Sequence, residues 1–448
     1  MQKVYLIHGW SVKETTTYQA LHIKLAEHGF DLEHIYLGRY VSLDNDVEIK
    51  DIAHAMHRAL TESLGKTEWS GPIHMITHST GALVVKQWLN SYYTGKVASK
   101  RPLKNLVFLA GPHFGSRLAH HGRSMLSQAF VTFGESGKQI LTSLELGSQF
   151  SWDNNGNLLS ERSWLKQGIR AYCLIGDRVH RDVFKSKIFP AAYEKGSDGV
   201  VRVSAGNLNF RRYRLDARTR RFRKLGEVSG VPFAALGQYE HSEPRHGIMN
   251  SITSRADPAA AKYQNLKLIL DCLKVGNADD YQRVGNRLKR ATRETRKKKP
   301  AYGQLDLWFR DDTGASIEDY VWELGCYREG VEKPSKTIAH THKNKIDASH
   351  FTVFLDMDEF EPRRSYFMRI KADSSTPLFH YQPNEFTVQL TGKQLRDIIA
   401  ADQTTQIEVV FERSSVKDLF RFHRGDDADL HVRWGRDGAV KEKKIKPK

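Results

Sequence analysis

The chain has 448 residues, too many for one ordinary domain, so we expect two or three domains. Apolar residues make up 40% of it, enough for packed cores, and the formal net charge of +17 predicts attraction to phospholipid headgroups or nucleic acid. The sequence contains neither an N-terminal apolar segment of signal-peptide length nor an apolar run near the roughly 18 residues of a membrane span. We therefore expect a protein that is cytoplasmic when made, with any export through a secretion system that needs no cleaved signal.

Three cysteines, Cys173, Cys272 and Cys326, lie far apart in the chain. Their odd number and their spacing fit neither a zinc site nor a disulfide framework. We expect buried free thiols, no metal and no other cofactor.

The first part of the chain alternates apolar runs with helical patterns. Residues 4–7 form a continuous apolar run typical of a strand buried on both faces, and residues 73–76 and 103–110 predict further buried strands. Residues 17–28 and 47–64 show helical spacing. This alternation predicts a doubly wound, mostly parallel α/β sheet.

Candidate functional residues follow the predicted strands. His8-Gly9-Trp10, Ser79 and Gly111-Pro112 each come directly after one strand, and ligands of such sheets bind at the carboxyl ends of the strands. Thr77-His-Ser-Thr-Gly81 has the layout of a nucleophile elbow, a sharp strand-to-helix turn that presents a serine hydroxyl. Thr77 stands where the elbow pattern has its first glycine. A buried strand followed by a helix that Ser79 caps is the alternative.

Two further segments of the first part have open interpretations. Residues 117–168 predict a helical insertion, which would be either a lid over the serine or an ordinary helical excursion. Residues 208–228 predict a hairpin in which arginines alternate with aromatics, either an anion-binding finger or a solvated edge whose charges block aggregation. We place the first domain at residues 1–275.

The composition then changes. Residues 276–302 are strongly basic and predict a helix that frays into a linker. Short strand patterns without long helices follow, and they predict an all-β sandwich over residues 303–435. They lie at residues 305–310, 320–324, 351–357, 366–372, 386–390, 407–412 and 419–423. Residues 436–448 form a basic tail.

A serine nucleophile needs a histidine to accept its proton, an acid to orient the histidine, and amides to stabilise the oxyanion. Ser79, Asp198 and His246 occur in the chain order that α/β-hydrolases use. Asp177, directly after a predicted strand, is the competing acid, and His241 is the competing base.

Together these motifs resemble α/β-hydrolases of the lipase kind, closest to the PGAP1-like and bacterial triacylglycerol lipase families. The resemblance covers residues 3 to about 273. It rests on His8-Gly9, the elbow, Gly-Pro-His-Phe-Gly-Ser at 111–116, Ser-Asp-Gly-Val-Val at 197–201 and His-Gly-Ile at 246–248.

The resemblance implies Ser79 as the nucleophile, His246 as the base and Asp198 as the acid, with the amides of Trp10 and Thr80 as the oxyanion hole. It favours His246 over His241 because His-Gly-Ile matches the family, and it implies that His113 supports the active-site loop.

The implied substrate is a lipid ester, and the basic charge favours a lipase or phospholipase in peripheral contact with anionic membrane rather than nucleic acid. The alternatives are an intracellular esterase of small substrates and a catalytically dead scaffold that binds anionic membrane or nucleic acid. A lipase without a signal and with a β-sandwich also resembles antibacterial lipase effectors of type VI secretion, which would imply a cognate immunity or delivery protein.

Overall fold

The computed structural model describes residues 1–9, 19–35, 45–64, 72–93, 103–121, 137–179, 193–416, 430–434 and 440–444. Its first part is built on a six-stranded, fully parallel sheet, as the alternating pattern predicted. The strands, in spatial order, are β2 (Phe30–Ile35), β1 (Gln2–Ile7), β3 (Ile73–His78), β4 (Leu103–Leu109), β5 (Arg170–Gly176) and β8 (Phe233–Leu236).

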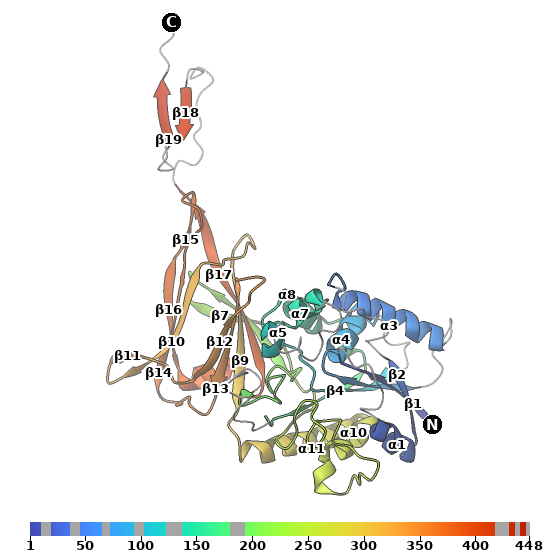
Figure 1. Cartoon of the computed structure of the whole chain (residues 1–448). Coiled ribbons are helices and arrows are strands. Elements are labelled where there is room, and N and C mark those ends of the chain that lie inside the picture. Colours follow the sequence, from blue (N-terminus) through green and yellow to red (C-terminus); the bar gives the residue numbers. More distant parts are fainter. Residues whose placement is uncertain are drawn as a thin grey trace.

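Helices cover both faces of this sheet (Figure 1). One face packs against α3 (Ile49–Leu64) and α4 (Gly81–Tyr92) around a core that includes Met56 and Trp88. The other packs against α1 (Gln19–Glu27), α10 (Gln264–Leu273) and α11 (Ala278–Arg296). All three cysteines are buried free thiols, as predicted, and no helix in the described ranges is long and apolar enough to cross a membrane.

The helical insertion between β4 and β5 is confirmed, and its described part belongs to the core. It contains α5 (Arg117–His121), α7 (Lys138–Leu144), α8 (Gln149–Gly156), η3 (Asn157–Leu159) and η4 (Trp164–Lys166). Ile140, Leu144, Leu158 and Trp164 are buried in the same core as α3 and α4. Residues 137–168 therefore form an ordinary helical excursion rather than a separate flap.

The second part is a sandwich of two sheets, as predicted, joined by one core. One sheet, in spatial order, contains β12 (Ile338–Lys343), β13 (His350–Asp356), β9 (Tyr302–Asp311), β17 (Thr404–Ser415), β6 (Phe210–Asp216) and β7 (Arg221–Val228), with β15 (Phe379–Gln382) beside β17. The other contains β11 (Val331–Pro334), β10 (Tyr320–Arg328), β14 (Ser365–Ala372) and β16 (Glu385–Thr391), which precedes α12 (Gly392–Ile398).

Six of the seven strand patterns predicted for this part coincide with β9, β10, β13, β14, β16 and β17, and only residue 357 lies outside its strand. Residues 419–423 lie outside the described residues. A separate two-stranded hairpin joins β18 (Leu430–Trp434) to β19 (Val440–Lys444), beyond the tip of β15 and β17 in Figure 1.

The expected boundary at residue 275 does not separate the two sheets. The predicted hairpin is present as β6 and β7. Because β6 pairs in parallel with β17, these two strands from the first part of the chain belong to the sandwich. The helix predicted in the basic segment after residue 275 is present as α11, but this helix packs on β8 up to its end at Arg296, so that much of the segment is not a linker.

Buried polar contacts also join the two parts. Arg202 is 1% exposed and forms two bonds with Glu194, at 2.9 and 3.0 Å, and its guanidinium lies 4.3 Å from the centre of the Phe354 ring. His342 Nε2 and Glu145 Oε1 are 3.0 Å apart, both buried. Removing one partner of such a buried pair is strongly destabilising, so these contacts help to hold the two parts together.

Candidate active site

Ser79 lies at a strained turn between β3 and α4. Its φ is +54°, a left-handed backbone conformation that residues other than glycine rarely adopt, as expected of a nucleophile elbow. A Cβ on Gly81 would lie 2.5 Å from the carbonyl oxygen of Ile7, so only glycine lets α4 begin this close to β1. Thr77, in the position of the pattern's first glycine, keeps regular register with β1 and β4 and does not interrupt the strand.

The structure brings His241, and not His246, to this serine. His241 Nε2 lies 2.9 Å from Ser79 Oγ, and its Nδ1 lies 2.9 Å from Asp198 Oδ2. The side chains of His241 and Asp198 are 9% and 0% exposed, so the contact is shielded from water. The favoured assignment of His246 is therefore wrong in its geometry, and the competing His241 occupies the position of the base.

The backbone between residues 240 and 247 explains this. The Glu240 amide donates to the His246 carbonyl at 2.8 Å, which folds the segment back on itself. The His241 amide donates to the Asp198 carbonyl at 2.9 Å, so residue 241 is fixed beside the acid. The half-buried His246 makes no side-chain hydrogen bond with any described residue.

The turn that contains Asp198 fixes the orientation of its carboxylate. Its Oδ1 accepts the amides of Val200 and Val201 at 2.9 and 2.7 Å, which leaves Oδ2 for His241. A Cβ on Gly176, the last residue of β5, would lie 2.2 Å from the Tyr239 carbonyl oxygen and 3.1 Å from Asp198 Cβ. Glycine at this strand end therefore lets both loops approach the sheet.

Asp177, the competing acid, is engaged elsewhere. Its Oδ2 lies 2.6 Å from Nη1 of Arg296, and Lys299 donates to its backbone carbonyl. Arg296 also pairs with Asp402, at 2.7 Å. Burial alone would lower the pKa of Arg296, but these two carboxylates outweigh it and raise the pKa. Asp177 thus anchors the end of α11.

His78, next to the serine in sequence, packs on the histidine of the site. The ring centres of His78 and His241 are 4.9 Å apart, and His78 Nε2 lies 3.2 Å from the His241 carbonyl oxygen. Burial, with a smaller effect of the His241 charge, lowers the pKa of His78 to about 3. A neutral His78 can donate to that carbonyl and fix the His241 backbone.

Of the two backbone amides expected to form an oxyanion hole, the structure describes only one. Trp10 lies outside the described residues. Thr80 is the N-cap of α4, and the first amides of a helix have no partner within the helix. A Cβ on Gly9, the residue before Trp10, would lie 2.9 Å from Ser79 Cβ, so the backbone of Gly9 packs directly on the serine.

Sequence reasoning missed a buried cluster behind the elbow. Lys86 Nζ lies 2.8 Å from Asn155 Oδ1 and 3.4 Å from the carbonyl oxygen of His113, in the loop after β4. Burial lowers the pKa of Lys86 to about 7 and that of His113 well below its usual range. The available signal was a lysine seven residues after Ser79, on a helix of otherwise buried apolar side chains. The expected support of the loop by His113 fits its burial.

Much of the basic hairpin is internally paired. Arg212 donates to Gln406 and to the backbone of Trp152, both at 2.6 Å. Arg214 pairs with Glu408 at 2.8 Å. Among the described residues of the hairpin, the exposed arginines without an ion pair to a carboxylate are Arg220, Arg221 and Arg223.

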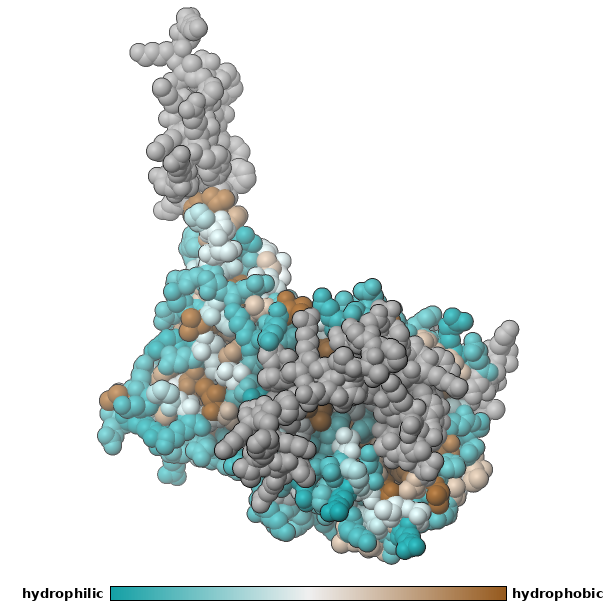
Figure 2. Space-filling model, in the orientation of Figure 1, coloured by the Kyte–Doolittle hydropathy of each residue, from teal (hydrophilic) through white to brown (hydrophobic). Residues whose placement is uncertain are grey.

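Figure 2 shows a mostly hydrophilic described surface on the face that it draws. The exposed large apolar side chains are Met1, Ile23, Leu225, Val321, Val331 and Ile346, scattered over separate elements. No group of histidine, cysteine and carboxylate side chains among the described residues could hold a metal ion.

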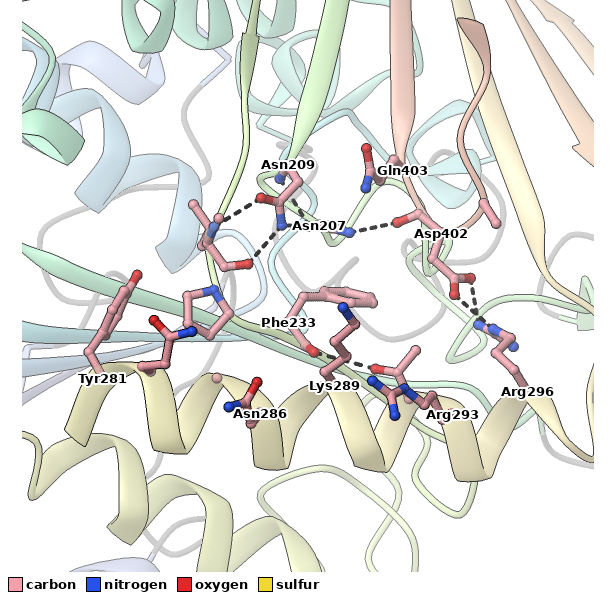
Figure 3. A pocket seen from close by; sticks show the side chains of 17 residues that line it. Asn207, Asn209, Phe233, Tyr281, Asn286, Lys289, Arg293, Arg296, Asp402 and Gln403 are labelled. Atoms are coloured by element: carbon pink, nitrogen blue, oxygen red, sulfur yellow. Dashed lines mark hydrogen bonds and ion pairs between the residues drawn. The ribbon is translucent and has the colours of Figure 1, made fainter. Parts of the chain in front are cut away.

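Hollows lined by described residues also lie outside the Ser79–His241–Asp198 contact. One, of about 640 Å³, lies along α11 between the two parts of the chain, with Phe233, Lys289 and Arg293 in its wall (Figure 3). Another, of about 730 Å³, is at the carboxyl ends of β5 and β8.

No protein-family model matches the sequence, and no curated protein matches it. Among solved structures, it is similar to phospholipase PlaB from Legionella pneumophila, at 27% identity and a TM-score of 0.82, over 95% of this chain and 96% of that one. The same phospholipase in complex with thio-NAD aligns at 27% identity and a TM-score of 0.83, over 100% of both chains. The chain therefore has a PlaB-like fold over its whole length, and the similarity suggests an ester hydrolase.

Proposed function

We propose that this protein is a lipase or phospholipase that cleaves carboxylic esters of membrane lipids through Ser79, His241 and Asp198. The observation that carries the proposal is the continuous hydrogen-bonded chain from Ser79 Oγ through His241 to Asp198, with the serine on a strained turn. Such a chain supplies the three groups that turn a weakly nucleophilic hydroxyl into an attacking one.

In this mechanism Ser79 Oγ attacks the ester carbonyl while His241 Nε2 accepts its proton. Asp198 stabilises the resulting imidazolium through Nδ1–H, and two backbone amides stabilise the oxyanion. Loss of the alcohol, which takes the proton from Nε2, leaves an acyl-serine. Water activated by His241 then releases the fatty acid. We assign the oxyanion hole to the amides of Thr80 and Trp10.

The lipid class rests on two supports. The solved protein of similar fold is a phospholipase, and the net charge of +17 favours an anionic surface. A chain of well-formed hydrogen bonds at Ser79 speaks against a scaffold without activity. An esterase of small substrates is the remaining alternative, and its turnover would not depend on an anionic interface.

For membrane contact we propose the exposed arginines of the hairpin tip, Arg220, Arg221 and Arg223. Each basic side chain near an anionic surface contributes about 1 kcal/mol. Arg211 and Arg212 are assigned to the fold instead, because they bond to Asp397, Gln406 and Trp152. Delivery as an antibacterial effector, with an immunity protein, stays a prediction.

The test is hydrolysis of a panel of phospholipids and neutral glycerides by the purified protein, followed by mass spectrometry of the products. We expect free fatty acid and lysophospholipid, and neither product with Ser79→Ala. Hydrolysis of short-chain soluble esters alone would assign the protein to the small-substrate esterases.

A further inference from the structure

The hollow at the carboxyl ends of β5 and β8 is basic. Arg178, Lys195, Lys298 and Lys299 contribute to its wall, and Asp177 is the one carboxylate among the described residues that line it. We call these four basic residues and their enclosed space the basic hollow. Its volume, about 730 Å³, is within the range of small-molecule sites.

The basic hollow lies beside the proposed catalytic residues. Its wall includes Ser197, the neighbour of Asp198, and Gly237, which directly follows β8 on the way to His241. Strands β3, β4 and β5 are consecutive in the sheet, and neighbouring strands are about 4.8 Å apart. The end of β5 is therefore roughly 10 Å from the end of β3, where Ser79 lies.

The charges in the basic hollow leave a positive excess. The carboxylate of Asp177 forms an ion pair with Arg296 at 2.6 Å, and Arg178 forms one with Glu240 at 3.0 Å. Lys195 and Lys298 are exposed and have no ion pair among the described residues. The ammonium groups of Lys195 and Lys298 therefore favour binding of an anion in the basic hollow. Hydrogen bonds between such charged partners are about twice as strong as those between neutral groups.

We propose that the basic hollow binds the phosphate of a phospholipid headgroup while an acyl ester of the same molecule lies at Ser79. This inference rests on the proposed function and names the substrate class for it. In a glycerophospholipid only the glycerol backbone separates the phosphate from the acyl esters, so one molecule can occupy both places. A neutral glyceride would leave the basic hollow empty and gain nothing from it.

The test compares dihexanoylphosphatidylglycerol with dihexanoylglycerol, both soluble and with the same acyl chains. Lys195→Gln combined with Lys298→Gln changes two exposed side chains and should leave the fold intact. We expect the ratio of kcat/KM for the phospholipid to that for the glyceride to fall about tenfold. The matched control is Lys267→Gln with Arg290→Gln, which removes two exposed charges from α10 and α11 outside the basic hollow.

A binding measurement keeps this test independent of turnover. In the Ser79→Ala background, calorimetry should show about tenfold weaker binding of dihexanoylphosphatidylglycerol after the double substitution. Competition by inorganic phosphate would mean that the basic hollow takes the phosphate group itself, and its absence that it takes only the lipid-borne headgroup. Equal effects on both lipids, equal effects in the control, or unchanged phospholipid binding would each overturn the proposal. Absent turnover with intact, lysine-dependent binding would count against the proposed function alone.

Discussion

Asp198 and His241 are joined twice: the carboxylate of Asp198 bonds to Nδ1 at 2.9 Å, and its backbone carbonyl accepts the His241 amide at 2.9 Å. This double attachment fixes both the position of the histidine loop and the orientation of its imidazole. Because Nδ1 is held by the acid, Nε2 faces the serine.

The first prediction separates the two candidate bases. His241→Ala should lower kcat by several orders of magnitude, up to about a million-fold, as loss of a triad histidine does. His246→Ala is the matched control and should stay within about threefold of wild type, because its side chain contacts neither Ser79 nor Asp198. The measurement is steady-state hydrolysis of a soluble ester. Equal losses would mean that both histidines serve the reaction.

The second prediction separates the two aspartates by what each supports. Asp198→Asn should lower kcat about ten-thousand-fold with little change in stability, because the imidazole would take the wrong tautomer. Asp177→Asn should instead lower the free energy of unfolding by about 3 kcal/mol, since it leaves Arg296 short of one carboxylate. Kinetics and denaturant unfolding of both variants check this. A large kcat loss without destabilisation in Asp177→Asn would contradict it.

The third prediction concerns Lys86 and pH. Burial lowers its pKa to about 7 from the unfolded value of 10.5, so between these values the unfolded state binds the extra proton. The contribution of Lys86 to the free energy of unfolding therefore rises with pH between about 7 and about 10.5. Below about pH 7 both states carry the proton, and the contribution no longer changes with pH.

Lys86→Met removes the titrating group at similar length. Between pH 7 and pH 9 the free energy of unfolding of wild type should therefore rise by about 2 kcal/mol relative to that of Lys86→Met. Urea unfolding at the two pH values measures it, with the exposed Lys267→Met as the control. Parallel pH profiles for Lys86→Met and wild type would show that Lys86 keeps an ordinary pKa in the fold.

The fourth prediction concerns the hairpin. Replacing Arg220, Arg221 and Arg223 with Gln should reduce turnover on anionic vesicles about tenfold or more at low salt, and leave turnover of a soluble short-chain ester unchanged. Arg212→Gln is the contrasting variant. It should lower stability and affect both substrates, because Arg212 bonds to Gln406 and Trp152. Equal losses on vesicles and soluble ester in the triple variant would assign the tip to the fold.

The sequence sufficed for what local pattern determines. Apolar runs and their spacing predicted the parallel sheet, and Ser79 in its elbow followed from a strand, a turn and a glycine that must approach β1. Asp198 was favoured over Asp177 because Ser-Asp-Gly-Val-Val at 197–201 resembles the acid-bearing turn of the family, and in the structure the amides of that turn hold one of its carboxylate oxygens.

The sequence failed where long-range pairing decides. His241 and His246 are five residues apart in one loop, and what distinguishes them is the set of contacts that residue 241 makes with the distant Asp198 and Ser79. Likewise residues 208–228 were predicted as a hairpin of the first domain, but β6 pairs with β17, nearly 200 residues away. Neither pairing leaves a local signal.

The most direct test of the central claim is covalent labelling with a fluorophosphonate, which reacts with activated serines, followed by mass spectrometry of the modified peptide. We predict one phosphonylated residue, Ser79, in wild type and in His246→Ala, and labelling at least a hundredfold slower in His241→Ala. Labelling at another serine, or rapid labelling of Ser79 in His241→Ala with loss of labelling in His246→Ala, would contradict the account.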